Sequence, residues 1–151
     1  MRRVFCIILF ILFVATGVTV VWRQTRRAVP VPAANFEIGK ADLIRVDFPR
    51  PNQTIQSPLT VKGKARGSWF FEASFPVILT DWDGRIIAEG IATAQGDWMT
   101  SEFVPFEAVI PFVKDPNAYS NRGALILRKD NPSGLPEHDD AFEIPVVLKK
   151  Q

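Results

Sequence analysis

Apolar and polar residues alternate through most of the chain after residue 43. About seven short apolar runs follow one another, at residues 44–48, 59–65, 75–79, 86–91, 106–112, 123–129 and 142–148. Side chains of a strand point alternately to the two faces of a sheet, so each run predicts a short strand. No stretch of useful length has helical spacing. Short strands separated by turn residues predict an all-β fold, a β-sandwich of about seven strands.

The segment 81–84 (DWDG) places two acidic residues beside a glycine between two of these runs. An EF-hand calcium loop needs an oxygen donor at position 5 and a glutamate at position 12. Counted from Asp81, these positions hold Arg85 and Ala92. Asp-Gly between apolar runs instead favours a type I′ hairpin turn, in which both central residues have positive φ. We therefore predict a hairpin at Asp83-Gly84 and no metal site.

Charge is distributed unevenly along the chain, whose net charge is +2. Residues 1–40 hold six Lys or Arg and one acid, a net charge of +5. Residues 41–151 hold twelve Lys or Arg and fifteen acids, a net charge of −3. A nucleic-acid-binding domain needs a basic surface that neutralises phosphates. The predicted domain is acidic overall, so we expect no nucleic-acid partner.

An uncharged apolar segment runs from Val4 to Trp22, with Arg2 and Arg3 before it and three arginines soon after it. A helix of this length, at ~1.5 Å per residue, nearly spans the ~30 Å hydrocarbon core of a bilayer. Trp22 suits the membrane interface. We predict one N-terminal transmembrane helix in residues 1–22, a single-pass anchor in the cell membrane. The arginine counts on its two sides leave the orientation open; the short N-terminal tail favours a signal anchor with the domain outside the cytoplasm.

A cleaved signal peptide is the alternative for the same segment. Val4–Val14 has the length of a signal-peptide core, and Ala15-Thr16-Gly17 offers small residues at a cleavage site. Cleavage there exposes the apolar stretch Val18–Trp22 as a new N-terminus, which favours the uncleaved anchor. In the alternative, the domain is a soluble secreted or periplasmic subunit.

Residues 23–40 (RQTRRAVPVPAANFEIGK) are predicted to be a linker. Val-Pro-Val-Pro favours an extended, semi-rigid spacer, and neither apolar period is present. The predicted domain then spans residues 41–151. This arrangement holds the domain away from the bilayer.

Residues suited to catalysis are few in the predicted domain. His138 is the only histidine, the only cysteine is Cys6 in the apolar segment, and no G-x-S-x-G motif is present. Glu89 and Asp97 are better interpreted as strand and turn residues than as a glycosidase pair. We therefore expect no enzymatic activity.

The segment 129–140 (KDNPSGLPEHDD) holds oxygen donors suited to calcium. Its Asn-Pro and Ser-Gly pairs are also typical of ordinary turns, and no known ligand spacing fits. We expect no metal site and no cofactor, with a calcium-binding loop as a weaker alternative.

Aromatic residues are the strongest candidates for ligand contacts. Trp69, Phe70 and Phe71 are consecutive, so a strand through them turns at least one ring outward. Trp82 lies on the strand phase opposite the apolar run 75–79, and Trp98 follows a turn. Exposed rings stack on sugars or anchor a protein partner; buried rings would instead form the sandwich core. Both alternatives stay open for the candidate ligand-binding residues Trp69, Phe70 and Trp98.

The order of motifs resembles the Gmad-type immunoglobulin-like domain of bacterial spore germination proteins. A Ser-Pro-Leu strand ending in Gly-x-Ala is followed by Phe-Glu, an Asp-x-x-Gly hairpin, a Pro-Phe strand and a final Pro-Val strand. The matching residues are Ser57, Pro58, Leu59, Gly63, Ala65, Phe71, Glu72, Asp81, Gly84, Pro105, Phe106, Pro145 and Val146. The resemblance spans nearly all of residues 43–149.

This resemblance implies an extracytoplasmic immunoglobulin-like β-sandwich without enzymatic activity, acting in envelope binding or assembly. Family members in spore formers often carry a companion germination domain, which we do not find in this sequence. We therefore expect a stand-alone, membrane-anchored module of the bacterial cell envelope. Its expected partners are the lipid bilayer, through the N-terminal helix, and an envelope protein or wall polysaccharide; a carbohydrate-binding domain is a weaker alternative.

Overall fold

The computed structural model of the protein describes residues 40–149. The predicted anchor Val4–Trp22 and the predicted linker, apart from Lys40, lie outside this range. No helix within residues 40–149 is long and apolar enough to cross a membrane. The elements are β1 (Ile44–Phe48), β2 (Thr54–Ile55), β3 (Leu59–Arg66), the 3-10 helix η1 (Gly67–Trp69), β4 (Ser74–Asp81), β5 (Ile86–Ala94), β6 (Phe103–Ile110), β7 (Arg122–Arg128), the 3-10 helix η2 (Pro136–His138) and β8 (Ala141–Leu148).

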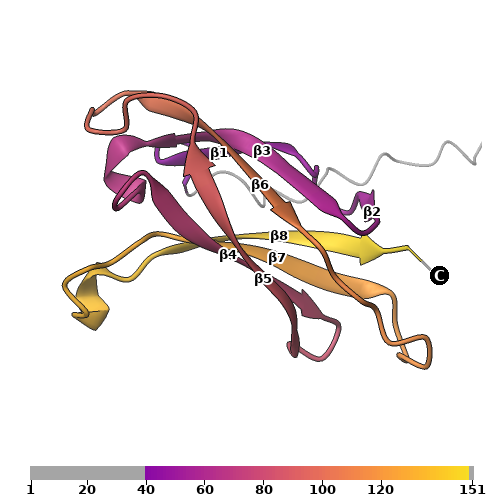
Figure 1. Cartoon of the computed structure of the whole chain (residues 1–151). Helices are drawn as coiled ribbons and strands as arrows, with labels where there is room; N and C mark the ends of the chain where they lie inside the picture. The colour runs from indigo at the N-terminus through magenta and orange to yellow at the C-terminus, as the bar shows by residue number, and fades with distance from the viewer. Residues whose placement is uncertain (1–39, 150–151) are drawn as a thin grey trace, which may run out of the picture. The chain divides into compact units, whose positions relative to one another are not determined.

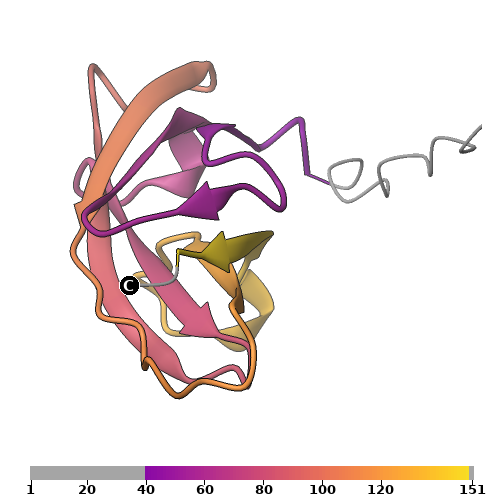
Figure 2. The same cartoon turned by 90° about the vertical axis from the view of Figure 1, so that its right-hand side faces the viewer.

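The strands form one eight-stranded sheet in the order β1-β3-β6-β5-β4-β7-β8-β2. All neighbouring pairs are antiparallel except β2 and β8, which are parallel. The register between β5 and β6 covers only the pairs Thr93–Glu107 and Ala94–Phe106. The sheet therefore curls there, and a β1–β3–β6 layer faces a β4–β7–β8 layer (Figure 1, Figure 2). The all-β prediction is confirmed.

The core lies between the two layers and follows the period-two pattern of the sequence. In β6, Val104, Phe106, Ala108 and Ile110 are buried while the residues between them are less so. The ring of Phe75 in β4 meets the ring of Phe106 in β6 edge-on, with 4.9 Å between their centroids. Edge-to-face aromatic contacts of this kind add to the gain from burial. They join the two layers of the curled sheet.

Two features of the sheet differ from the prediction. The eighth strand, β2, lies between the apolar runs 44–48 and 59–65, where no strand was predicted, because a two-residue strand is too short to show a period. In β1 the register shifts between Val46 and Phe48. This irregularity breaks the alternation, so the side chain of Phe48 is 38% exposed although it continues the apolar phase of Ile44 and Val46.

Candidate functional site

The carboxylate of Asp81 organises the turn between β4 and β5. Its Oδ1 accepts hydrogen bonds from the backbone N–H groups of Asp83 (2.9 Å) and Arg85 (3.0 Å). The N–H of Asp81 donates to the carbonyl of Arg85 at 2.9 Å, and the N–H of Gly84 donates to the carbonyl of Asp81 at 3.2 Å. The predicted hairpin is therefore confirmed, and the carboxylate of Asp81 stabilises the turn that follows it.

The predicted type I′ turn is wrong. Gly84 has a φ of 76°, but Asp83 is not one of the residues with positive φ. Trp82, Asp83 and Gly84 form a three-residue loop, in which a type I turn ends in a glycine in the left-handed region. Asp81 is at the first position of this turn, where an aspartate can accept N–H groups from the turn, and this favours type I over type I′. The turn projects Trp82 from the end of the domain.

Trp82 contacts Tyr119 of the β6–β7 loop. The ring centroids are 5.5 Å apart and the ring planes are tilted by 54°. Trp82 is 45% exposed and Tyr119 is 89% exposed. The two loops reach the same end of the domain (Figure 1), so segments distant in sequence build one aromatic pair.

Local hydrogen bonds also fix the β6–β7 loop that carries Tyr119. The carboxylate of Asp115 accepts the N–H of Asn117 at 2.8 Å, and its carbonyl accepts the N–H of Ala118 at 3.2 Å. The same carbonyl accepts a bond from Nζ of Lys114 at 3.1 Å, and Lys114 is only 6% exposed. Trp82 thus lies in a turn closed by the carboxylate of Asp81, and Tyr119 directly follows a turn closed by that of Asp115.

Trp82 and Tyr119 have the properties of a contact site. Aromatic rings dominate binding energies because they bury a large area, and they also stack on sugar rings. Two further exposed apolar side chains lie close by in the sequence, Ile86 at the start of β5 and Val113 in the β6–β7 loop. Sequence reasoning noted the outward phase of Trp82 but missed Tyr119. The sequence did hold a signal for this residue: Tyr119 is the only tyrosine, and it lies in a polar segment with Pro116 and Asn117, where an aromatic ring is expected to be exposed.

Two of the three predicted ligand-binding residues lie in the core. Trp69 is 1% exposed and Phe70 is 4% exposed, so they cannot form an exposed aromatic face. The reason is local: Trp69 belongs to η1, where the period is about three residues rather than the two of a strand. Phe71 is the ring that turns outward, with 40% exposure. Trp98 is partly buried against the core, and its role as a ligand contact stays a prediction.

The loop between β7 and β8 is organised by Asn131. Its amide donates to the carbonyl of Leu135 at 2.9 Å and to the carboxylate of Asp139 at 2.8 Å. Asp140 forms an ion pair with Lys40. These contacts occupy oxygens that the calcium alternative would require. In the part of the chain that the structure describes, no three His, Cys, Asp or Glu side chains gather into a metal site.

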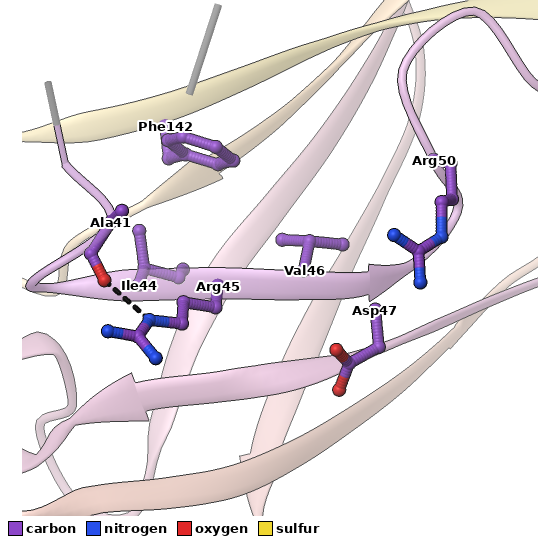
Figure 3. A pocket seen from close by; sticks show the side chains of 7 residues that line it. All are labelled: Ala41, Ile44, Arg45, Val46, Asp47, Arg50 and Phe142. Carbon is purple, nitrogen blue, oxygen red and sulfur yellow. Dashed lines mark hydrogen bonds between the residues drawn. The ribbon is translucent and has the colours of Figure 1, made fainter. Parts of the chain in front are cut away.

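A groove of about 190 Å³ lies beside β1, lined by Ala41, Ile44, Arg45, Val46, Asp47, Arg50 and Phe142. Figure 3 shows Val46 on the side of β1 that faces Phe142, with Asp47 on the opposite side. Its apolar residues Ile44, Val46 and Phe142 are already buried in the core. The groove therefore continues the boundary between the two layers of the sheet. Its charged residues, Arg45, Asp47 and Arg50, are exposed.

One family model matches the chain: the immunoglobulin-like domain of bacterial spore germination, Gmad2, over residues 43–134. The match covers every element from β1 to β7 and stops before β8, so it is shorter than the resemblance inferred from the motifs. Neither a curated protein nor a solved structure matches the chain.

Proposed function

Because the chain belongs to the family of immunoglobulin-like domains of bacterial spore germination, we propose that it is a non-catalytic, membrane-anchored binding module of the bacterial cell envelope. The domain stands outside the cytoplasm on the linker of residues 23–40. It contacts an envelope partner through Trp82 and Tyr119. The observation that carries this proposal is the exposed ring pair on two loops that are closed by Asp81 and Asp115.

The absence of catalysis in this proposal rests on the family, whose fold is non-enzymatic. The carboxylates of Asp81 and Asp115 support it, because Asp81 accepts two backbone N–H groups of its own turn and Asp115 accepts one. A carboxylate used in this way positions a loop. The end of the domain that holds the β4–β5 turn and the β6–β7 loop thus has the features of a contact surface, with exposed aromatic rings beside hydrogen-bonded turns.

Binding is tested by capture with the full chain, immobilised from mild detergent. The probes are purified wall sacculi of the host and a solubilised envelope fraction. We expect Trp82→Ala and Tyr119→Ala each to weaken capture about 30-fold, since a ring at a binding hot spot contributes ~2 kcal/mol or more. The melting temperature should change little, because both side chains are substantially exposed.

Phe71→Ala is the matched control, since Phe71 is similarly exposed but precedes β4, whereas Trp82 follows it. The control should retain capture. Loss only of sacculus binding identifies a polysaccharide partner, and loss only of envelope-fraction binding identifies a protein. Undiminished capture of both probes by the Trp82→Ala/Tyr119→Ala variant would contradict the proposed site.

The anchor is tested by the intact mass of the protein purified from its own host, without prior separation of membranes. We expect the mass of the uncleaved polypeptide, because the apolar segment continues past the small residues at 15–17 as far as Trp22. Loss of residues 1–17 would instead establish the soluble secreted or periplasmic subunit.

A further inference from the structure

Three cationic side chains surround a single aromatic ring on the outer face of the β1–β3–β6 layer. The guanidinium carbons of Arg45 and Arg66 lie 4.6 Å and 4.2 Å from the centroid of the Phe103 ring, and Nζ of Lys64 lies 5.8 Å from it. The register produces this arrangement. Arg45 pairs with Lys64 between β1 and β3, and Arg66 pairs with Phe103 between β3 and β6. We call these four residues the Phe103 cluster.

Backbone carbonyls hold both guanidinium groups in place. Nε of Arg45 donates to the carbonyl of Ala41 at 2.7 Å (Figure 3). Nε of Arg66 donates to the carbonyl of Asp42 at 3.0 Å, and Nη1 donates to the carbonyl of Ser101 at 3.0 Å. Besides these three bonds, no further hydrogen bond of either guanidinium group is found within residues 40–149. The cluster therefore presents positioned donors that are not yet used.

The cluster has more positive charge than its neighbours neutralise. Within the described residues, its only ion pair joins Arg66 to Glu102 at 3.6 Å, and the Glu102 side chain is 80% exposed. An exposed pair of this kind contributes little. The Phe103 ring attracts each cation, and a bound anion would further reduce the repulsion between them. The excess is local, because residues 41–151 carry a net charge of −3.

From this geometry we infer that the Phe103 cluster is a binding site for a phosphate group. The guanidinium fork matches phosphate oxygens with paired hydrogen bonds, and a lysine adds a mobile point charge. A phosphate on a lipid headgroup and a soluble phosphate offer the same chemistry. A lipid source rests on the proposed anchor, since the cluster is bonded to the turn at Ala41 and Asp42, next to the linker. The phosphate chemistry is independent of the anchor.

Lys62 provides a matched control for this site. It lies on the same face of β3 as Lys64, two positions away, but its ammonium pairs with Glu107 at 3.2 Å. Lys62→Gln and Lys64→Gln therefore remove the same charge from one surface, and only Lys64→Gln changes the cluster. Both side chains are exposed, so both variants should fold like the wild type.

The experiment measures binding to the full chain in a non-ionic detergent. The probes are inorganic pyrophosphate and mixed micelles that contain phosphatidylglycerol, with phosphatidylcholine micelles as the uncharged reference. We expect Lys64→Gln to weaken binding about tenfold, the loss of one charge-assisted hydrogen bond, and Lys62→Gln to change it less than about twofold. The Trp82→Ala/Tyr119→Ala variant should bind both probes like the wild type. This result separates the Phe103 cluster from the proposed contact site at Trp82 and Tyr119.

Binding of phosphatidylglycerol alone supports a lipid headgroup as the source, and binding of pyrophosphate alone supports a soluble phosphate. The inference is overturned if neither probe binds. It is also overturned if the two lysine variants lose affinity equally, because the effect would then be that of net charge.

Discussion

Trp69→Ala is expected to lower the free energy of unfolding by about 3–5 kcal/mol, the usual cost of truncating a fully buried aromatic side chain. Trp69 is among the largest fully buried side chains, with 1% exposure. Within the described residues its indole N–H has no hydrogen-bond partner, so truncation sacrifices burial and packing and no hydrogen bond. Denaturant unfolding of the wild type and variant measures the difference.

Trp98→Ala is the matched comparison for this prediction. Trp98 is only partly buried against the same core, so its truncation should cost clearly less than that of Trp69. If Trp69→Ala left the unfolding midpoint near that of the wild type, Trp69 would be accessible and again a candidate ligand contact. If Trp98→Ala were the more damaging variant, the burial of these two rings would be assigned in the wrong order.

The sequence predicted those parts of the fold that depend on a local period. The buried phase of β6, with Phe106, Ala108 and Ile110, is readable because alternate side chains of a strand share a face. The 3-10 helix η1 could not be predicted, since its three residues, Gly67–Trp69, are too few to show a helical period. Treating this segment as strand placed Trp69 and Phe70 among the candidates for exposure. Short elements and irregularities such as the one after Val46 depend on the partner strand.

The candidate sites depend on contacts between distant segments. The outward phase of Trp82 follows from the alternation of the preceding strand, but its contact with Tyr119 depends on how the β6–β7 loop packs. The Phe103 cluster likewise requires the register of three strands, which brings Arg45 beside Lys64 and Arg66 beside Phe103. Register is set by packing across the sheet, and a single sequence shows only the alternation within each strand. Such sites become visible only in the folded chain.

Gly67→Ala is expected to destabilise the domain by about 3 kcal/mol or more, the upper part of the range for overpacking. A Cβ at Gly67 would collide with the carbonyl oxygens of Thr100 and Trp98 in the β5–β6 loop. These are backbone atoms, so a side-chain rotation cannot relieve the collision. The loop must move, which also strains the bond from Arg66 to the carbonyl of Ser101.

Gly96→Ala is the matched control for Gly67→Ala, because it lies near the start of the same loop and its Cβ would meet nothing within 4 Å. Its φ is outside the left-handed region. An added methyl group at a compatible glycine stabilises by ~0.4–1 kcal/mol through the unfolded chain, so Gly96→Ala should unfold at or slightly above the wild-type denaturant concentration. Equal midpoints for the two variants would show that the β5–β6 loop does not pack directly on Gly67. A large loss only in Gly67→Ala establishes that approach, and with it the position of the Ser101 carbonyl that holds Arg66 beside Phe103.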